Sequence, residues 1–143
     1  MLNSGLSNTM AASLAGKEVR ALSNKVGLEA GKDSQIQFKL NDIATETEIT
    51  ITDAQGNTVR TESLGGLGKG NHEWTWDGKS DAGNEAPEGV YSVEIKAKNE
   101  DSSVDALTFI EGTAEKVHYS ESGVELLVNG AYIPLGDVEE IGI

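Results

Sequence analysis

The stretch HEWTWDGKSDAGNEAPEGVYSVEIKA, residues 72–97, decides the fold that we predict for this chain. Trp74 and Trp76 fall with His72 on one side of an alternating segment, and polar side chains fill the other side. Alternation with a period of two predicts a half-buried strand. Residues 86–89 then suit a type I turn, with proline second and glycine last. A second strand follows this turn, with one face formed by Tyr91, Val93, Ile95 and Ala97.

The residues before this stretch predict further strands of the same kind. Apolar side chains alternate with polar ones over residues 36–40, and residues 47–64 show the pattern on both sides of a turn. In that turn Asp53 can accept a backbone hydrogen bond and Gly56 can take positive φ, as in a hairpin with a glycine bulge. Short strands separated by such turns predict an all-β sandwich.

The C-terminal residues predict a second, smaller β unit. Asn129-Gly130 lies between the apolar runs 124–128 and 131–135, and this dipeptide is the strongest short-range signal for a hairpin. The unit is too short to fold comfortably by itself. We expect it to recruit residues 17–26 as an extra strand, which would make the sandwich an insertion in a discontinuous domain.

The N-terminal residues predict a helix. Apolar side chains recur there about every fourth residue and form one stripe, at Leu2, Leu6, Met10 and Leu14. A narrow stripe of this kind is typical of a packing or oligomer-contact element.

Composition excludes several partners. The chain has 24 acidic and 11 basic residues and a formal net charge of -13, which repels phosphate. Neither nucleic acid nor an anionic membrane is therefore an expected partner. The absence of cysteine removes disulfides, thiolate nucleophiles and cysteine metal sites. The sequence has no recognisable secretory signal or membrane span.

The histidines do not predict catalysis. His72 and His118 stand outside any recognisable nucleophile motif, and packing on a strand face is the favoured interpretation of both. We predict no catalytic and no cofactor-binding residues.

The acidic residues beside the tryptophans raise a calcium hypothesis, because hard cations take oxygen ligands from loops of this kind. The residues concerned are Asp77, Asp81, Glu85 and Glu88. Their spacing does not match the helix–loop–helix calcium motif, and turn residues that accept backbone hydrogen bonds are the simpler interpretation. We predict no metal ligands.

Trp74 and Trp76 have two interpretations. Aromatic rings exposed on one sheet face would suit a carbohydrate-binding or adhesin-type module. The favoured alternative places them mainly in the sandwich core, because the chain has few other aromatic side chains to fill it.

The order WTWDGKSDAGNEAPEGVYSVEIKA, residues 74–97, resembles the immunoglobulin-like module of the bacterial flagellar hook-capping family. Upstream, AASLAGKEV at 11–19 is similar to the family's helix-to-strand entry. Downstream, GTAEKVHYSESGVELLVNGAYIPLGDVEEI at 112–141 is similar to its closing segment. The resemblance covers essentially the whole chain.

The resemblance implies an all-β fold with three parts. An N-terminal helix, 1–15, precedes a small Tudor-like β-barrel built from 16–31 and 107–143. An immunoglobulin or fibronectin III-like sandwich, 32–106, is inserted in that barrel.

The resemblance also implies a scaffold and not an enzyme. Such a protein caps the distal end of the growing hook and assists assembly of hook subunits, with the hook subunit as partner and no cofactor. Family members leave through the flagellar export apparatus without a cleaved signal peptide. The family has a further N-terminal region with an Asp-Pro element, which this chain lacks, so we expect a truncated or short form. Self-association into a cap is expected of the full-length protein.

Overall fold

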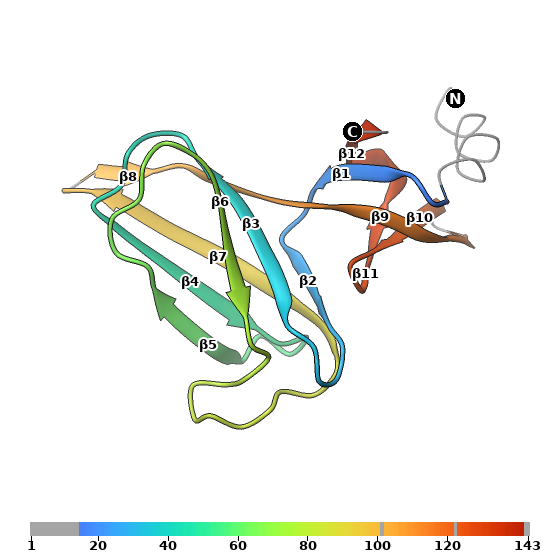
Figure 1. Ribbon diagram of the computed structural model, residues 1–143, viewed down its shortest axis with the longest axis horizontal. Coiled ribbons are helices and arrows are strands. Elements are labelled where there is room, and N and C mark those ends of the chain that lie inside the picture. The colour runs from blue at the N-terminus through green and yellow to red at the C-terminus, as the bar shows by residue number, and fades with distance from the viewer. Residues whose placement is uncertain (1–14, 101, 122, 142–143) are drawn as a thin grey trace.

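The computed structural model describes residues 15–100, 102–121 and 123–141 (Figure 1). The predicted helix over 1–15 lies almost wholly outside the described residues. The strands are β1 (Glu18–Leu22), β2 (Lys25–Leu28), β3 (Ser34–Leu40), β4 (Glu46–Thr52), β5 (Thr58–Ser63), β6 (Gly70–Trp76), β7 (Gly89–Asn99), β8 (Ser102–Val104), β9 (Ala106–Ser120), β10 (Gly123–Val128), β11 (Ala131–Pro134) and β12 (Val138–Ile141). A single 3₁₀ turn, η1 (Leu135–Asp137), separates β11 from β12. Within these described residues no helix is long and apolar enough to cross a membrane.

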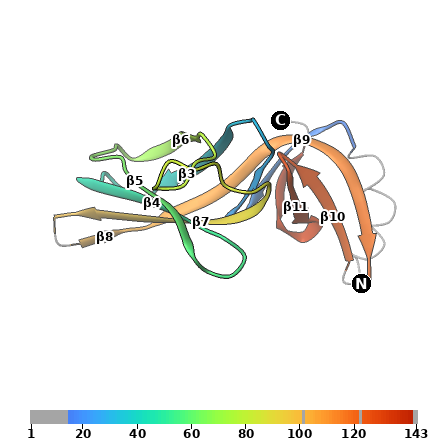
Figure 2. The same cartoon turned by 90° about the horizontal axis from the view of Figure 1, so that it is seen from below.

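Two antiparallel layers form a sandwich, as the alternation predicts. One layer has the order β2-β7-β4-β5, with β8 beside β7, and the other pairs β6 with β3 and β3 with β9 (Figures 1 and 2). Side chains from the inner faces form the first core, whose largest members are Trp76, Phe38, Leu40, Ile49 and Ile51. Burying these apolar side chains is the main favourable term in folding.

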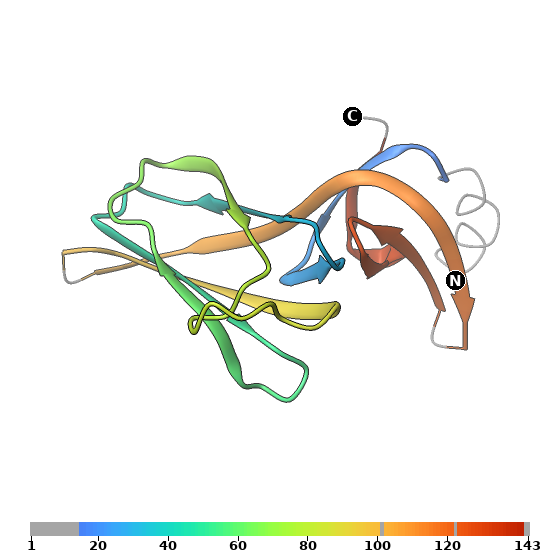
Figure 3. The same cartoon turned by 60° about the horizontal axis from the view of Figure 1, so that its bottom comes forward.

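A second core lies beside the sandwich. It is enclosed by a curved sheet of order β11-β10-β9-β1-β12 (Figure 3). Its buried residues are Val19, Ala21, Ile110, Ala114, Leu126, Val128, Ala131 and Ile133. The pairing path runs from β11 to β12 and, over the described residues, has no pairing between those two ends. The structure therefore shows an all-β fold with a curved second sheet, and a closed barrel remains a prediction.

One long strand belongs to both units. The first part of β9 pairs with β3, and Phe109, near the start of β9, lies opposite both Gln37 of β3 and Leu22 of β1. The rest of β9 pairs with β1 and β10. The sandwich and the second unit are therefore connected by continuous backbone hydrogen bonding.

The segment 16–31, which the family resemblance assigns to the barrel, divides between the two units. β1 pairs with β9 and β12 in the second unit, as expected for an extra strand. In contrast, β2 pairs with β7, and its Val26 and Leu28 lie in the first core. The chain thus enters the sandwich before residue 32.

The predicted Asn129-Gly130 hairpin is confirmed and connects the units. Both residues have positive φ, 49° and 83°, as a type I′ turn between β10 and β11 requires. The turn lies against β2, where a Cβ built on Gly27 would be 2.4 Å from the Gly130 carbonyl carbon. The Asn129 side-chain amide also donates a 3.0 Å hydrogen bond to the Glu111 carbonyl.

Candidate interaction surface

Trp76 lies in the core, as the favoured interpretation predicts. Its side chain is 0% exposed and packs edge-on against Tyr91, with ring centroids 5.2 Å apart. The indole N–H donates a 2.9 Å hydrogen bond to the Lys79 carbonyl, which satisfies its polar atom. Trp74 is half-buried against the same core. Because a sugar platform needs exposed rings, Trp76 cannot contribute to one.

The Tyr91 hydroxyl ties β7 to the segment that precedes it. It donates a hydrogen bond to the Pro87 carbonyl, four residues upstream. This arrangement resembles the tyrosine corner of immunoglobulin-like sandwiches. Burial raises the pKa of Tyr91 above its ordinary value.

Asp77 and Asp81 are held by Arg60. The guanidinium of Arg60 donates to Asp77 Oδ1 at 3.2 Å and to Glu62 Oε1 at 2.9 Å, while Asp81 Oδ1 lies 3.9 Å from its Nε. The hydrogen bond to Glu62 is the largest cause that raises the pKa of Arg60. Asp77 Oδ1 also accepts the Lys79 N–H at 3.0 Å, as the turn interpretation predicts.

Asp81 additionally covers the free edge of β5. Its Oδ1 accepts the Thr61 N–H at 3.0 Å, and its own N–H donates to the Val59 carbonyl at 2.9 Å. Covered edges are protected from pairing with another chain. The aspartate thus performs a structural task that its sequence position does not reveal.

The other two acids of the calcium hypothesis lie elsewhere. Glu88 accepts the Ala30 N–H at 3.3 Å, and Glu85 borders a separate hollow near Pro87. Across 15–100, 102–121 and 123–141, no three His, Asp or Glu side chains gather in a way that could hold a metal ion.

The histidines pack on strand faces. His72 Nε2 lies 2.6 Å from the Gly68 carbonyl oxygen, and its ring centroid is 5.6 Å from that of Phe38. The His118 ring packs against Tyr132 at 5.4 Å. Neither has a serine hydroxyl among these contacts.

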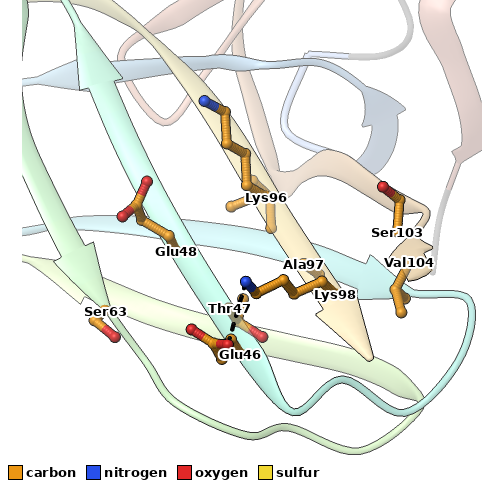
Figure 4. A pocket seen from close by; sticks show the side chains of 10 residues that line it. Glu46, Thr47, Glu48, Ser63, Lys96, Ala97, Lys98, Ser103 and Val104 are labelled. Carbon is orange, nitrogen blue, oxygen red and sulfur yellow. Dashed lines mark ion pairs between the residues drawn. The ribbon is translucent and has the colours of Figure 1, made fainter. Parts of the chain in front are cut away.

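A polar surface that the sequence did not predict is a hollow of about 520 Å³ on the outer face of β4 and β7. We call it the outer-face hollow. Figure 4 shows its charged side chains rising from these two strands, at Glu46, Glu48, Lys96 and Lys98. Ser63 of β5 and Ser103 of β8 flank it. The sequence does carry a signal for this surface, because charged residues occupy every second position in this part of β4 and β7. They alternate with Thr47, Ile49 and Ala97, whose side chains face the core.

The register places opposite charges side by side. Glu46 lies opposite Lys98, and Glu48 lies opposite Lys96. Lys98 Nζ is 3.4 Å from Glu46 Oε2, but their side chains are 55% and 69% exposed. Exposed pairs contribute little to stability, so these charges remain available to a partner. The surface can recognise a complementary polar protein surface through charge and shape.

Comparison with known proteins finds one family. A family model described as "FlgD Ig-like domain" matches residues 23–101. The "Basal-body rod modification protein FlgD" of Escherichia coli K12 is 44% identical over 61 residues, which are 43% of this chain and 26% of that protein. The protein of the same name from Buchnera aphidicola subsp. Acyrthosiphon pisum is 25% identical over 130 residues, 90% of this chain and 55% of that protein. The chain thus spans about a quarter to a half of these relatives.

Solved structures share the fold. FlgD from Pseudomonas aeruginosa has a TM-score of 0.72 at 23% identity, and the match covers 90% of this chain and 98% of that one. FlgD from Xanthomonas campestris has a TM-score of 0.72 at 24% identity, and the match covers 95% of this chain and 99% of that one. Its structure is described as giving insights into the hook capping essential for flagellar assembly. Because the matched family model extends over more than half of the residues, the chain belongs to the FlgD family.

Proposed function

We propose that this protein is a flagellar hook-capping scaffold that assists assembly of hook subunits at the distal end of the growing hook. The observation that carries the proposal is the match of residues 23–101 to the FlgD Ig-like domain. The description of the Xanthomonas campestris structure, which refers to hook capping, supports the same role. The scaffold acts by binding and not by covalent chemistry.

The proposed partners follow from this role. The chain binds the flagellar hook subunit, and the full-length protein self-associates into a cap. It reaches the hook through the flagellar export apparatus without a cleaved signal peptide.

The proposed domain division keeps the inserted sandwich and a Tudor-like barrel. The barrel comprises 16–22 and 107–141, because β1 and β9–β12 surround the second core. Residues 23–31 join the sandwich, because Val26 and Leu28 lie in the first core.

Deletion of the gene in the bacterium that carries it tests the function. The deletion strain is expected to lose hooks and swimming, and the wild-type gene should restore both. Normal hooks in the deletion strain would refute the proposal.

The outer-face hollow is the proposed contact surface for the hook subunit. Its charges are exposed and lie on two paired strands, which suits specific recognition. Lys96→Glu with Lys98→Glu should weaken binding to purified hook subunit and leave the melting temperature nearly unchanged. Lys17→Glu with Lys116→Glu, at two exposed lysines of the second unit, is the control matched in charge. Equal loss in both variants would indicate a general charge effect and would exclude the hollow.

A further inference from the structure

A second hollow lies at the end of the sandwich where β7 begins. We call it the β7 hollow, and its volume of about 530 Å³ is in the range typical of ligand pockets. One wall is the β4–β5 turn at 53–58, and the other wall is the β6–β7 loop at 80–88. Figure 1 shows both connections at this end of the sandwich.

The floor of the β7 hollow is apolar. Half-buried Val59 and Ala86 pack against the first core, and Tyr91 is a buried member of that core. Pro87 and Val90 also line the hollow, and the Val90 side chain is 45% exposed. Apolar side chains gathered in an open hollow favour contact with a partner.

Backbone hydrogen bonds fix both walls. In the β6–β7 loop the Ser80 N–H donates to the Asn84 carbonyl at 2.8 Å, and in the β4–β5 turn the Asp53 N–H donates to the Asn57 carbonyl at 2.9 Å. The bonds of Asp81 to β5, described above, join the loop to the sheet. The hollow is therefore largely pre-formed, which lowers the entropy lost when a partner binds.

The strand β7 extends past the end of β4 beside this hollow. The last pair between the two strands is Thr52 with Ser92, and the chain then turns toward β5. Residues 89–91 pair with β2 on one side. Over the described part of the chain, no strand pairs with them on the other side, which borders the hollow.

Val90 directs both of its backbone polar groups toward this unpaired side. The Val93 N–H donates to the Asn24 carbonyl at 2.8 Å, so the backbone groups of Val93 face the β2 side. Because hydrogen bonds alternate along an antiparallel strand, those of Tyr91 face β2 as well, and those of Val90 face away from it. The Val90 N–H and C=O thus form a short free strand edge beside the hollow.

The charges around the hollow have one sign. Among its lining residues the charged ones are Asp53, Glu85 and Glu88, with no lysine, arginine or histidine. Within 15–100, 102–121 and 123–141, none of these three carboxylates forms an ion pair with a basic side chain. The hollow is therefore complementary to a cationic group.

We propose that the β7 hollow binds an extended peptide segment of a partner protein in which a lysine or arginine lies next to apolar residues. The segment pairs with the free edge at Val90 as a short added strand and places its basic side chain among the three carboxylates. The β7 hollow shares no lining residue with the outer-face hollow. The inference therefore holds whether or not the hook-capping proposal is correct.

A synthetic peptide tests the inference. The capped peptide acetyl-TVKVKVT-amide is titrated into ¹⁵N-labelled protein, and the amide signals are recorded. Those of Ala54, Glu85 and Val90 should shift and saturate, and that of Lys116 in the second unit should stay unchanged. The same peptide with glutamate in place of lysine should not bind. Absence of saturable shifts at the hollow, or equal shifts with the glutamate peptide, would overturn the inference.

Hydrogen exchange tests the strand pairing. In the free protein the Val90 N–H should exchange faster than the Tyr91 N–H, because only the latter pairs with β2. Peptide at about ten times its Kd should slow the exchange of Val90 about tenfold, since only the unbound fraction exchanges freely. Unchanged exchange at Val90 in the saturated complex would contradict the added strand.

A matched pair of variants tests the charges. Glu85→Gln with Glu88→Gln should weaken peptide binding about threefold to thirtyfold, as the loss of two exposed ion pairs predicts. Glutamine at 88 retains an oxygen that can accept the Ala30 N–H. Glu73→Gln with Glu115→Gln, at exposed glutamates outside the hollow, is the control of equal charge and should weaken binding less than about twofold. Equal weakening in both variants would indicate attraction to the net negative charge alone and would overturn the inference.

Discussion

Gly27 of β2 and Gly130 of the β10–β11 turn are in direct backbone contact, close enough that a Cβ on Gly27 would lie 2.4 Å from the Gly130 carbonyl carbon. Real Cβ atoms essentially never approach backbone this closely. One residue belongs to the sandwich and the other to the second unit. The contact therefore joins the sandwich to the second unit.

Gly27→Ala is expected to destabilise the protein by about 1–3 kcal/mol, because overpacking against backbone forces a shift of the turn. Gly68→Ala is the control, since nothing lies within 4 Å of a Cβ at that position. Urea unfolding of both variants measures the difference. Equal midpoints for the two variants would show that the units do not meet at Gly27.

Trp76→Ala should lower the free energy of unfolding by about 3–5 kcal/mol, because it leaves a large cavity in the core. Trp74→Ala is the matched control, and its half-buried ring predicts a smaller loss of about 1–2 kcal/mol. Thermal and urea unfolding measure both. A near-wild-type curve for Trp76→Ala would contradict its place in the core.

Arg60→Lys should destabilise by about 1–2 kcal/mol, because a lysine ammonium cannot reproduce the forked hydrogen bonds to Asp77 and Glu62. The Arg60 side chain is 21% exposed, so solvent screens these bonds only partly. Lys98→Gln removes the exposed pair with Glu46 and should change stability by at most about 0.5 kcal/mol. If Arg60→Lys destabilised the protein no more than Lys98→Gln does, the hydrogen bonds of Arg60 would not contribute to stability as proposed.

The pKa of the Asp53 carboxyl predicts how the stability of the protein changes in acid. Hydrogen bonds from backbone N–H groups, that of Asn57 first, lower the pKa of its carboxyl below the ordinary value of 3.8. A lowered pKa in the folded state contributes stability that is present above the unfolded pKa and is lost as the pH falls through the folded one. Asp53→Asn should therefore flatten the decline of stability below about pH 4. Identical pH profiles for the variant and the wild type would contradict this role.

The alternation of apolar and polar side chains was sufficient to predict the buried face of strands that bury one face. The alternation over residues 36–40 and 72–76 correctly predicted which side chains face the core. The turn at Asp53–Gly56 and the hairpin at Asn129-Gly130 were correct because positive φ favours glycine and asparagine strongly.

Pairing over long sequence separations could not be predicted from such patterns. β2 pairs with β7 through Val26 and Tyr91, which are far apart in the chain, and nothing in its four residues identifies that partner. The roles of Arg60 and Asp81 likewise depend on a loop folding back onto the edge of β5. The outer-face hollow exists only because the register of β4 and β7 aligns their charges.

The shared strand β9 has a consequence for the order in which the protein can form. In any N-terminus-first synthesis or translocation β1 emerges before the sandwich strands β3–β8, yet its partners β9 and β12 emerge after them. The sandwich strands can therefore pair with one another before β9 and β12 are present to pair with β1. Such distant pairings make folding slow, and the second core can be completed only after β12 has emerged.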